Sequence, residues 1–140
     1  MGIEKIARDF ISDTLMSDPD IVGALDDRIY SGLAPEAPMT GSIIYPFLVF
    51  GEGTFTREAN GCGGLLRKME IEVLLVQDTP NSLTAASVLY DRVIAALTPR
   101  ARARETIPNY VFHQIEGGEL SVDNDYLVRG RLSVEIAINE

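Results

Sequence analysis

Residues 67–76 have the sequence RKMEIEVLLV, and after a short turn residues 83–97 have the sequence LTAASVLYDRVIAAL. In the first segment four apolar side chains alternate with Lys and Glu, which is the period-two pattern of a half-buried strand. The second segment places its Leu, Val and Tyr side chains on one stripe of an amphipathic helix. The Thr-Pro pair at residues 79–80 suits a helix start, because Thr can cap a helix and Pro fits its first position. The stretch therefore predicts a strand that leads directly into a helix.

The rest of the chain supplies further elements around this strand and helix. Helical or alternating spacing predicts helices at about 3–16 and 21–25, a short extended piece at 28–30, and strands at 43–50, 109–115 and 127–138. The last two strands are expected to form an antiparallel hairpin. We therefore expect one domain over residues 1–140 with an α+β fold, in which two main helices pack on one face of an antiparallel or mixed four-stranded sheet.

Several segments have the composition of connections. Residues 31–42 hold two prolines and two glycines without periodicity, which predicts a loop. Residues 54–64 are expected to form a long flexible hairpin connection of the kind that a partner often orders. A turn is expected at or beside residues 117–119 and 123–125. The glycines around the long connection are candidate partner contacts: Gly51, Gly53, Gly61, Gly63 and Gly64.

The composition excludes several classes of function. The formal net charge of −9 argues against a sequence-specific or general nucleic-acid binder and against docking on anionic membranes. The sequence contains no run of 18 apolar residues, so we predict no membrane span, and the N-terminal residues lack the pattern of a signal peptide. One cysteine and one histidine cannot supply an intramolecular disulfide or a zinc quartet.

Candidate catalytic groups are scarce. A nucleophile needs a base within hydrogen-bond reach, and Cys62 and His113 are the available cysteine and histidine. We interpret Cys62 as a small residue in a glycine-rich loop and His113 as a structural or surface residue. Glu70 and Glu72 have the spacing of paired carboxylates, but the neighbouring Lys68 favours a solvated face. We expect no enzymatic activity, no cofactor and no metal, although a small soluble enzyme or ligand-binding domain stays open because Asp and Glu alone can carry chemistry.

Arginines cluster at two places in this acidic chain. Arg100, Arg102 and Arg104 alternate with small residues, so they are candidate contacts for an acidic surface of another copy or of a partner. The alternative is a solvated loop. Arg129 and Arg131 lie on the polar side of the last predicted strand, and this side faces either a neighbouring subunit or water.

Two short motifs carry a resemblance to a known family. Residues 27–35 read DRIYSGLAP, and residues 45–50 read YPFLVF. Together with the N-terminal helix, the charged alternating strand, the Ala/Leu-rich helix and the terminal hairpin, their order resembles the tail-completion or tail-terminator proteins of long, non-contractile-tailed bacteriophages. The resemblance covers nearly the whole chain. Residues 39–45, which are longer and more apolar, and residues 61–64 depart from the family pattern.

The resemblance implies a structural role in a virion. Such proteins assemble as rings, usually hexamers, that cap the end of the tail tube, stop its polymerisation and present a surface to the head connector. The implied partners are other copies of the chain, the tail tube protein and the head-tail connector protein, and the implied location is the head-proximal end of the tail after assembly in the host cytoplasm. The resemblance carries over no catalytic residue. A head-completion or neck connector protein that binds the portal side is the alternative.

Overall fold

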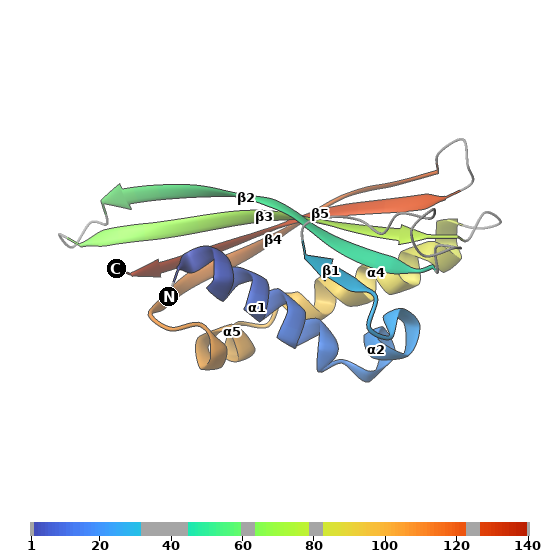
Figure 1. Cartoon of the computed structure of the whole chain (residues 1–140), viewed down its shortest axis with the longest axis horizontal. Coiled ribbons are helices and arrows are strands. Elements are labelled where there is room, and N and C mark those ends of the chain that lie inside the picture. The colour runs from blue at the N-terminus through green and yellow to red at the C-terminus, as the bar shows by residue number, and fades with distance from the viewer. Residues whose placement is uncertain (1, 32–44, 60–63, 79–82, 123–126, 140) are drawn as a thin grey trace.

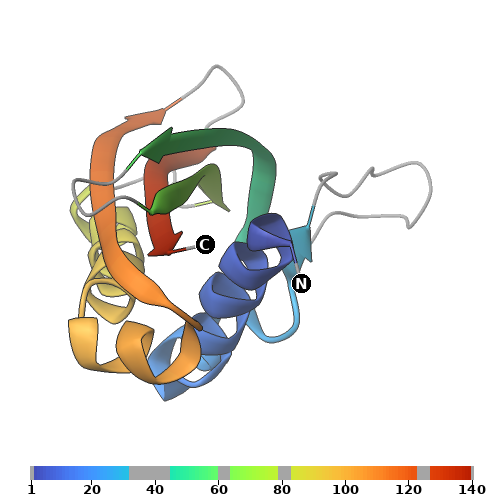
Figure 2. The same cartoon turned by 90° about the vertical axis from the view of Figure 1, so that its left-hand side faces the viewer.

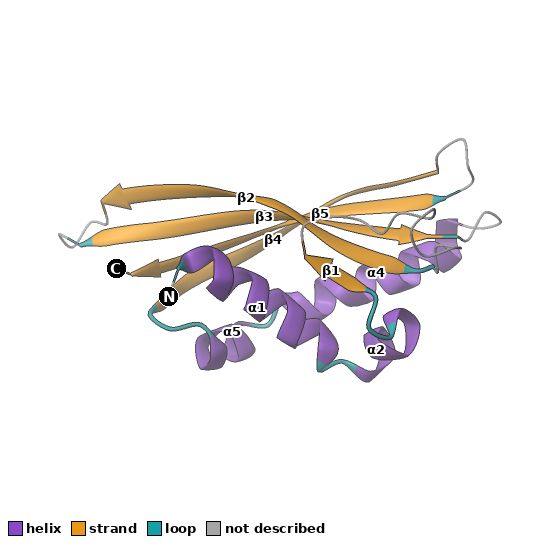
Figure 3. Cartoon of the chain, in the orientation of Figure 1, coloured by secondary structure: helices purple, strands orange, loops and turns teal. Residues whose placement is uncertain are grey.

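The computed structural model describes residues 2–31, 45–59, 64–78, 83–122 and 127–139. Figures 1 and 3 show long strands that lie above a layer of helices. The elements in chain order are α1 (Ile3–Met16), α2 (Pro19–Leu25), β1 (Ile29–Ser31), β2 (Phe47–Ala59), β3 (Leu65–Gln77), α4 (Leu83–Leu97), α5 (Arg100–Thr106), β4 (Tyr110–Val122) and β5 (Val128–Asn139).

The described strands form a mixed five-stranded sheet with the order β1-β2-β3-β5-β4. β1 pairs in parallel with β2, and the other neighbours pair antiparallel. The expected four-stranded sheet with two main helices is therefore wrong, since the described residues contain five strands and four helices. The short piece at β1 adds an edge strand because it pairs with the beginning of β2. The short helix expected at 21–25 is α2, and α5 is a helix that the sequence did not predict.

The two long helices begin and end where the sequence predicts. The predicted helix at 3–16 is α1, and the predicted helix at 83–97 is α4. The helices lie on one face of the sheet, and Figure 2 shows this arrangement along the long axis of the molecule. In the described part of the chain no helix is long and apolar enough to cross a membrane.

α2 begins at a well-defined cap. Asp18 Oδ1 accepts hydrogen bonds from the backbone N–H groups of Asp20 (3.0 Å) and Ile21 (3.3 Å), and Pro19 occupies the first turn. Arg92 of α4 donates to Asp18 Oδ2 at 2.9 Å. Burial raises the pKa of Asp18, but the hydrogen bonds from Arg92 and the two N–H groups outweigh it, so this pKa lies below its ordinary value of 3.8.

One apolar core fills the space between the helices and the sheet. α1 contributes buried Ile6, Phe10 and Leu15, while β3 contributes Ile71 and Val73 from the face that its alternation predicts. This burial of apolar surface is the dominant stabilising contribution to the fold.

Two strands are longer than the sequence predicts. β2 continues to Ala59, so the flexible connection expected over 54–64 is wrong in its first half. β4 continues through residues 117–119, where a turn was expected, and its pairing with β5 shifts register there. Residues 123–125, the other part of the expected turn, lie outside the described residues, as do residues 32–42 of the expected loop.

Candidate functional site

The arginine segment is helical, and its arginines have different environments. In α5 the helical spacing turns Arg102 away from Arg100 and Arg104, which are exposed. The Arg102 guanidinium donates to Thr14 Oγ1 at 3.0 Å and to the Asp13 carbonyl oxygen at 3.2 Å. These acceptors lie in the last turn of α1, where the negative end of the helix dipole favours a cation. Arg102 thus joins α5 to α1, and Arg100 and Arg104 are left as candidates for a partner contact.

The glycines predicted as partner contacts do not flank one loop. Gly51 and Gly53 lie inside β2, and Gly64 directly precedes β3. Gly61 and Gly63 lie outside the described residues. The described glycines thus lie in β2 and directly before β3, and their role as partner contacts stays a prediction.

A β-bulge in β2 accounts for the first two of these glycines. Phe50 lies opposite Val73, but Gly53 lies opposite Ile71, so residues 51–52 together face one residue of β3. The extra residue shifts the alternation of β2 by one position. Before the bulge even-numbered side chains point towards the helices, and after it odd-numbered side chains do.

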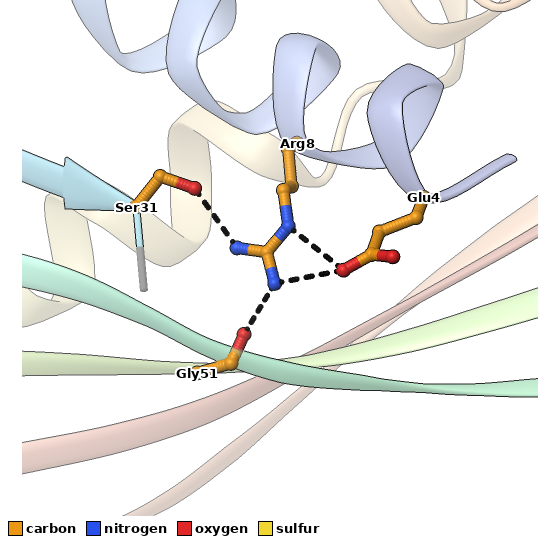
Figure 4. A network of polar contacts seen from close by, with 4 residues as sticks. All are labelled: Glu4, Arg8, Ser31 and Gly51. Atoms are coloured by element: carbon orange, nitrogen blue, oxygen red, sulfur yellow. Dashed lines mark hydrogen bonds and ion pairs between the residues drawn. The ribbon is translucent and has the colours of Figure 1, made fainter. Parts of the chain in front are cut away.

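Arg8 of α1 holds this bulge in place (Figure 4). Its guanidinium donates to the Gly51 carbonyl oxygen at 2.8 Å and to Ser31 Oγ at 3.0 Å, and it forms an ion pair with Glu4 at 3.1 Å. The Arg8 side chain is 18% exposed, so water screens these contacts only in part. Arg8 therefore ties α1 to β1 and β2. From the sequence alone this role of Arg8 could not be predicted, because Arg8 resembles any polar residue of an amphipathic helix. The bulge itself had one sequence signal, the Gly-x-Gly at residues 51–53.

Beyond the bulge, β2 and β3 continue to the end of the sheet as a hairpin that we call the hairpin arm, residues 53–59 and 65–69, and β5 pairs with β3 alongside it. All side chains of residues 54–59 are exposed. Two of the exposed residues in the arm are large and apolar, with Phe55 47% exposed and Leu65 41% exposed. Isolated exposed apolar residues are ordinary. These two share one face of the hairpin, four positions apart in the register, with the Arg57–Arg67 pair between them.

One face of the hairpin arm combines these apolar residues with arginines. The register places Arg57 opposite Arg67, with Phe55 and Leu65 on the same face. The Arg57 guanidinium lies 5.9 Å from the centroid of the Phe55 ring, within the range of a cation–π contact. Aromatic residues and arginine are enriched at protein interfaces, so this face has the composition of a binding surface.

The opposite face of the sheet carries the carboxylates that the sequence showed at paired spacing. Glu70 and Glu135 are direct cross-strand neighbours. Ser133 Oγ donates to Glu70 at 2.9 Å, and Arg131 forms an ion pair with Glu72 at 2.5 Å. These contacts are those of a solvated polar face, and antiparallel sheets commonly present one such face to water.

His113 links β4 to the end of α4. Its Nε2 lies 2.9 Å from the Leu97 carbonyl oxygen and 3.0 Å from that of Thr98, and its Nδ1 lies 2.7 Å from the Tyr110 hydroxyl. Because carbonyl oxygens only accept, Nε2 carries a hydrogen, and in the neutral imidazole Nδ1 then accepts from the Tyr110 hydroxyl. Cys62 lies outside the described residues. Within the described ranges no group of three or more His, Cys, Asp or Glu residues is arranged to hold a metal ion.

Comparisons with known proteins add a likeness of fold. No family model and no curated protein matches the sequence. Among solved structures, the chain is similar to one in the virion of a native gene transfer agent (GTA) particle. The sequences are 10% identical, the match covers 93% of this chain and 92% of that chain, and the TM-score is 0.62. The likeness extends over almost the full length of both chains and shows that they share a fold.

Proposed function

We propose that this chain is a virion structural protein that closes the end of a tail tube as a ring, ending tube polymerisation and joining the tail to the head. The observation that carries the proposal is the likeness of fold, over nearly the whole of both chains, to a chain of a gene transfer agent virion. The motifs at 27–35 and 45–50, which resemble tail terminators, narrow this virion role to the tail end. A structural role also agrees with the contacts of His113, which joins β4 to the end of α4.

A ring needs two different surfaces on each subunit, because a heterologous contact closes on itself only when one patch binds a different patch on the next copy. The hairpin arm and the exposed arginines Arg100 and Arg104 are surfaces of this kind. We propose a hexamer, with the tail tube protein on one side of the ring and the head-tail connector protein on the other. The ring would lie at the head-proximal end of the tail.

Mass and binding measurements test this role. We expect light scattering of the purified chain to give a multiple of the 15.3 kDa subunit, and negative-stain microscopy to show rings that bind tail tube protein. Rings that bind only portal or adaptor protein would instead indicate a neck connector. A monomer that binds neither the tube nor the connector would contradict a role at the tail end.

A further inference from the structure

A groove between α2 and α4 forms a further candidate surface. It has a volume of about 690 Å³ and is lined by residues of α4 and α2, by Pro46 directly before β2 and by Gln77 at the end of β3. Val88, which lines it, is 67% exposed, the largest exposed fraction among the exposed large hydrophobic residues of the described chain. An exposed β-branched residue inside a concave apolar surface favours a site that another molecule covers.

The groove carries negative charge. Asp20 and Asp91 line it beside Arg92, and Arg92 is already engaged by Asp18 at 2.9 Å and by Asp20 at 3.6 Å. Two carboxylates therefore engage the Arg92 guanidinium, and Asp91 adds a further negative charge to the lining. An apolar surface with an acidic surround selects a partner that presents apolar side chains together with positive charge.

The hairpin arm presents that combination. Its face carries Phe55 and Leu65 with Arg57 and Arg67, and it belongs to a chain whose formal net charge is −9. Positive charge beside exposed apolar residues is thus concentrated on a surface that complements the groove in both respects.

The arm of one chain does not reach its own groove. Phe55 lies nine residues along the chain from Pro46, which lines the groove, and nine residues of extended strand span about 30 Å. Figure 1 shows the far ends of β2 and β3 at one end of the long axis, and α2 near the other. A contact between arm and groove therefore joins two copies head to tail, which is the heterologous geometry that builds rings.

We propose that the hairpin arm of each copy docks in the α2–α4 groove of the next copy, with Phe55 and Leu65 on the apolar lining and the arginines beside Asp20 and Asp91. This inference rests on the proposed ring and names the contact that closes it.

Three matched substitutions test the contact. Phe55→Glu alters the arm, Val88→Glu alters the groove, and Val111→Glu alters a residue of β4 that is 40% exposed and belongs to neither surface. Each variant is compared with wild type by light scattering, with thermal unfolding to establish that it folds. We expect the arm and groove variants each to fall to the 15.3 kDa monomer and the β4 variant to keep the wild-type mass.

Mixing the arm variant with the groove variant gives the decisive readout. One intact arm and one intact groove meet in the mixture, so we expect dimers of twice the subunit mass and nothing larger. A mixture that stays monomeric, or a β4 variant that also dissociates, would overturn the pairing of arm and groove. Arm and groove variants that keep the wild-type mass would overturn this contact but not the proposed ring. The same conclusion would hold if the arm variant kept its mass and lost only its binding to the tube protein. A wild-type chain that stays monomeric up to about 1 mM would overturn the ring itself, and this inference with it.

Discussion

Replacing Gly130 with alanine tests how α4 packs on the sheet. A Cβ at Gly130 of β5 would lie 2.7 Å from Tyr90 Cε1 and 2.8 Å from Leu120 Cδ2. Tyr90 is 4% exposed and cannot withdraw freely, because its hydroxyl accepts the Gly118 N–H at 2.8 Å and donates to the Arg131 carbonyl oxygen. Overpacking a core costs about 1–3 kcal/mol. We therefore expect the free energy of unfolding to fall by that amount and Tm to fall by about 3–10 °C.

Gly23 provides a matched control for this substitution. It lies exposed in α2, and a Cβ there would have nothing within 4 Å, so Gly23→Ala should stabilise the protein by about 0.5–1 kcal/mol. Both variants are measured by denaturant unfolding at one protein concentration, since association would shift the transition. In a Tyr90→Ala background most of the extra cost of Gly130→Ala should vanish, because the clashing ring is gone. A Gly130→Ala variant with the wild-type midpoint would refute the described packing of Tyr90.

Three further predictions concern polar contacts. Asp18→Asn keeps a capping side chain but removes its charge. Because the pKa of Asp18 is lowered in the folded protein, the contribution of this charge to the free energy of unfolding should be complete above pH 3.8 and lost as the pH falls through the folded pKa. A difference in stability between variant and wild type that does not narrow in acid would contradict this. Arg102→Met should lower the free energy of unfolding by about 1 kcal/mol while Arg104→Met changes it by less than about 0.5 kcal/mol, and equal effects in denaturant unfolding would argue against their separate roles. Arg8→Met should speed amide hydrogen exchange at residues 51–59 and leave β5 unchanged, whereas unchanged exchange would mean that Arg8 does not anchor the bulge.

The sequence was sufficient for the elements whose periodicity is unbroken. α1, α4 and β3 each keep one apolar face from end to end, and their predicted positions agree with the structure. Strand β5 also alternates without interruption, which is why its predicted bounds are accurate to one residue at each end.

Strands β2 and β4 could not be predicted to their full length because bulges change the phase of their alternation. In β2, Phe50 and Phe55 both point to the helix side although one is even-numbered and the other odd-numbered. In β4 the glycines at 117–118 resemble a turn, but the Tyr90 hydroxyl binds the backbone of Gly118 and the strand continues. A contact from α4, distant in sequence, therefore decides the local structure.

The candidate contact surfaces depend on the same long-range information. The sequence indicated that the glycines between Gly51 and Gly64 and the arginines near 100 could meet a partner, and neither proposal is tested by the structure. It could not show that Arg102 turns inward to α1, because the Pro99 that precedes the arginines suited a loop as well as a helix start. It also could not show the groove, whose lining comes from α2, α4, β3 and Pro46, which lie far apart in the sequence.

The growth of tail tubes in the presence of this chain tests the proposed function most directly. Tube protein is polymerised with and without the purified chain, and the lengths and ends of the tubes are recorded by electron microscopy. We expect added chain to form a ring at one end of each tube and to stop elongation there, so that later addition of tube protein does not lengthen capped tubes. Tubes that continue to grow at the same rate and carry no ring would contradict the role of a tail terminator.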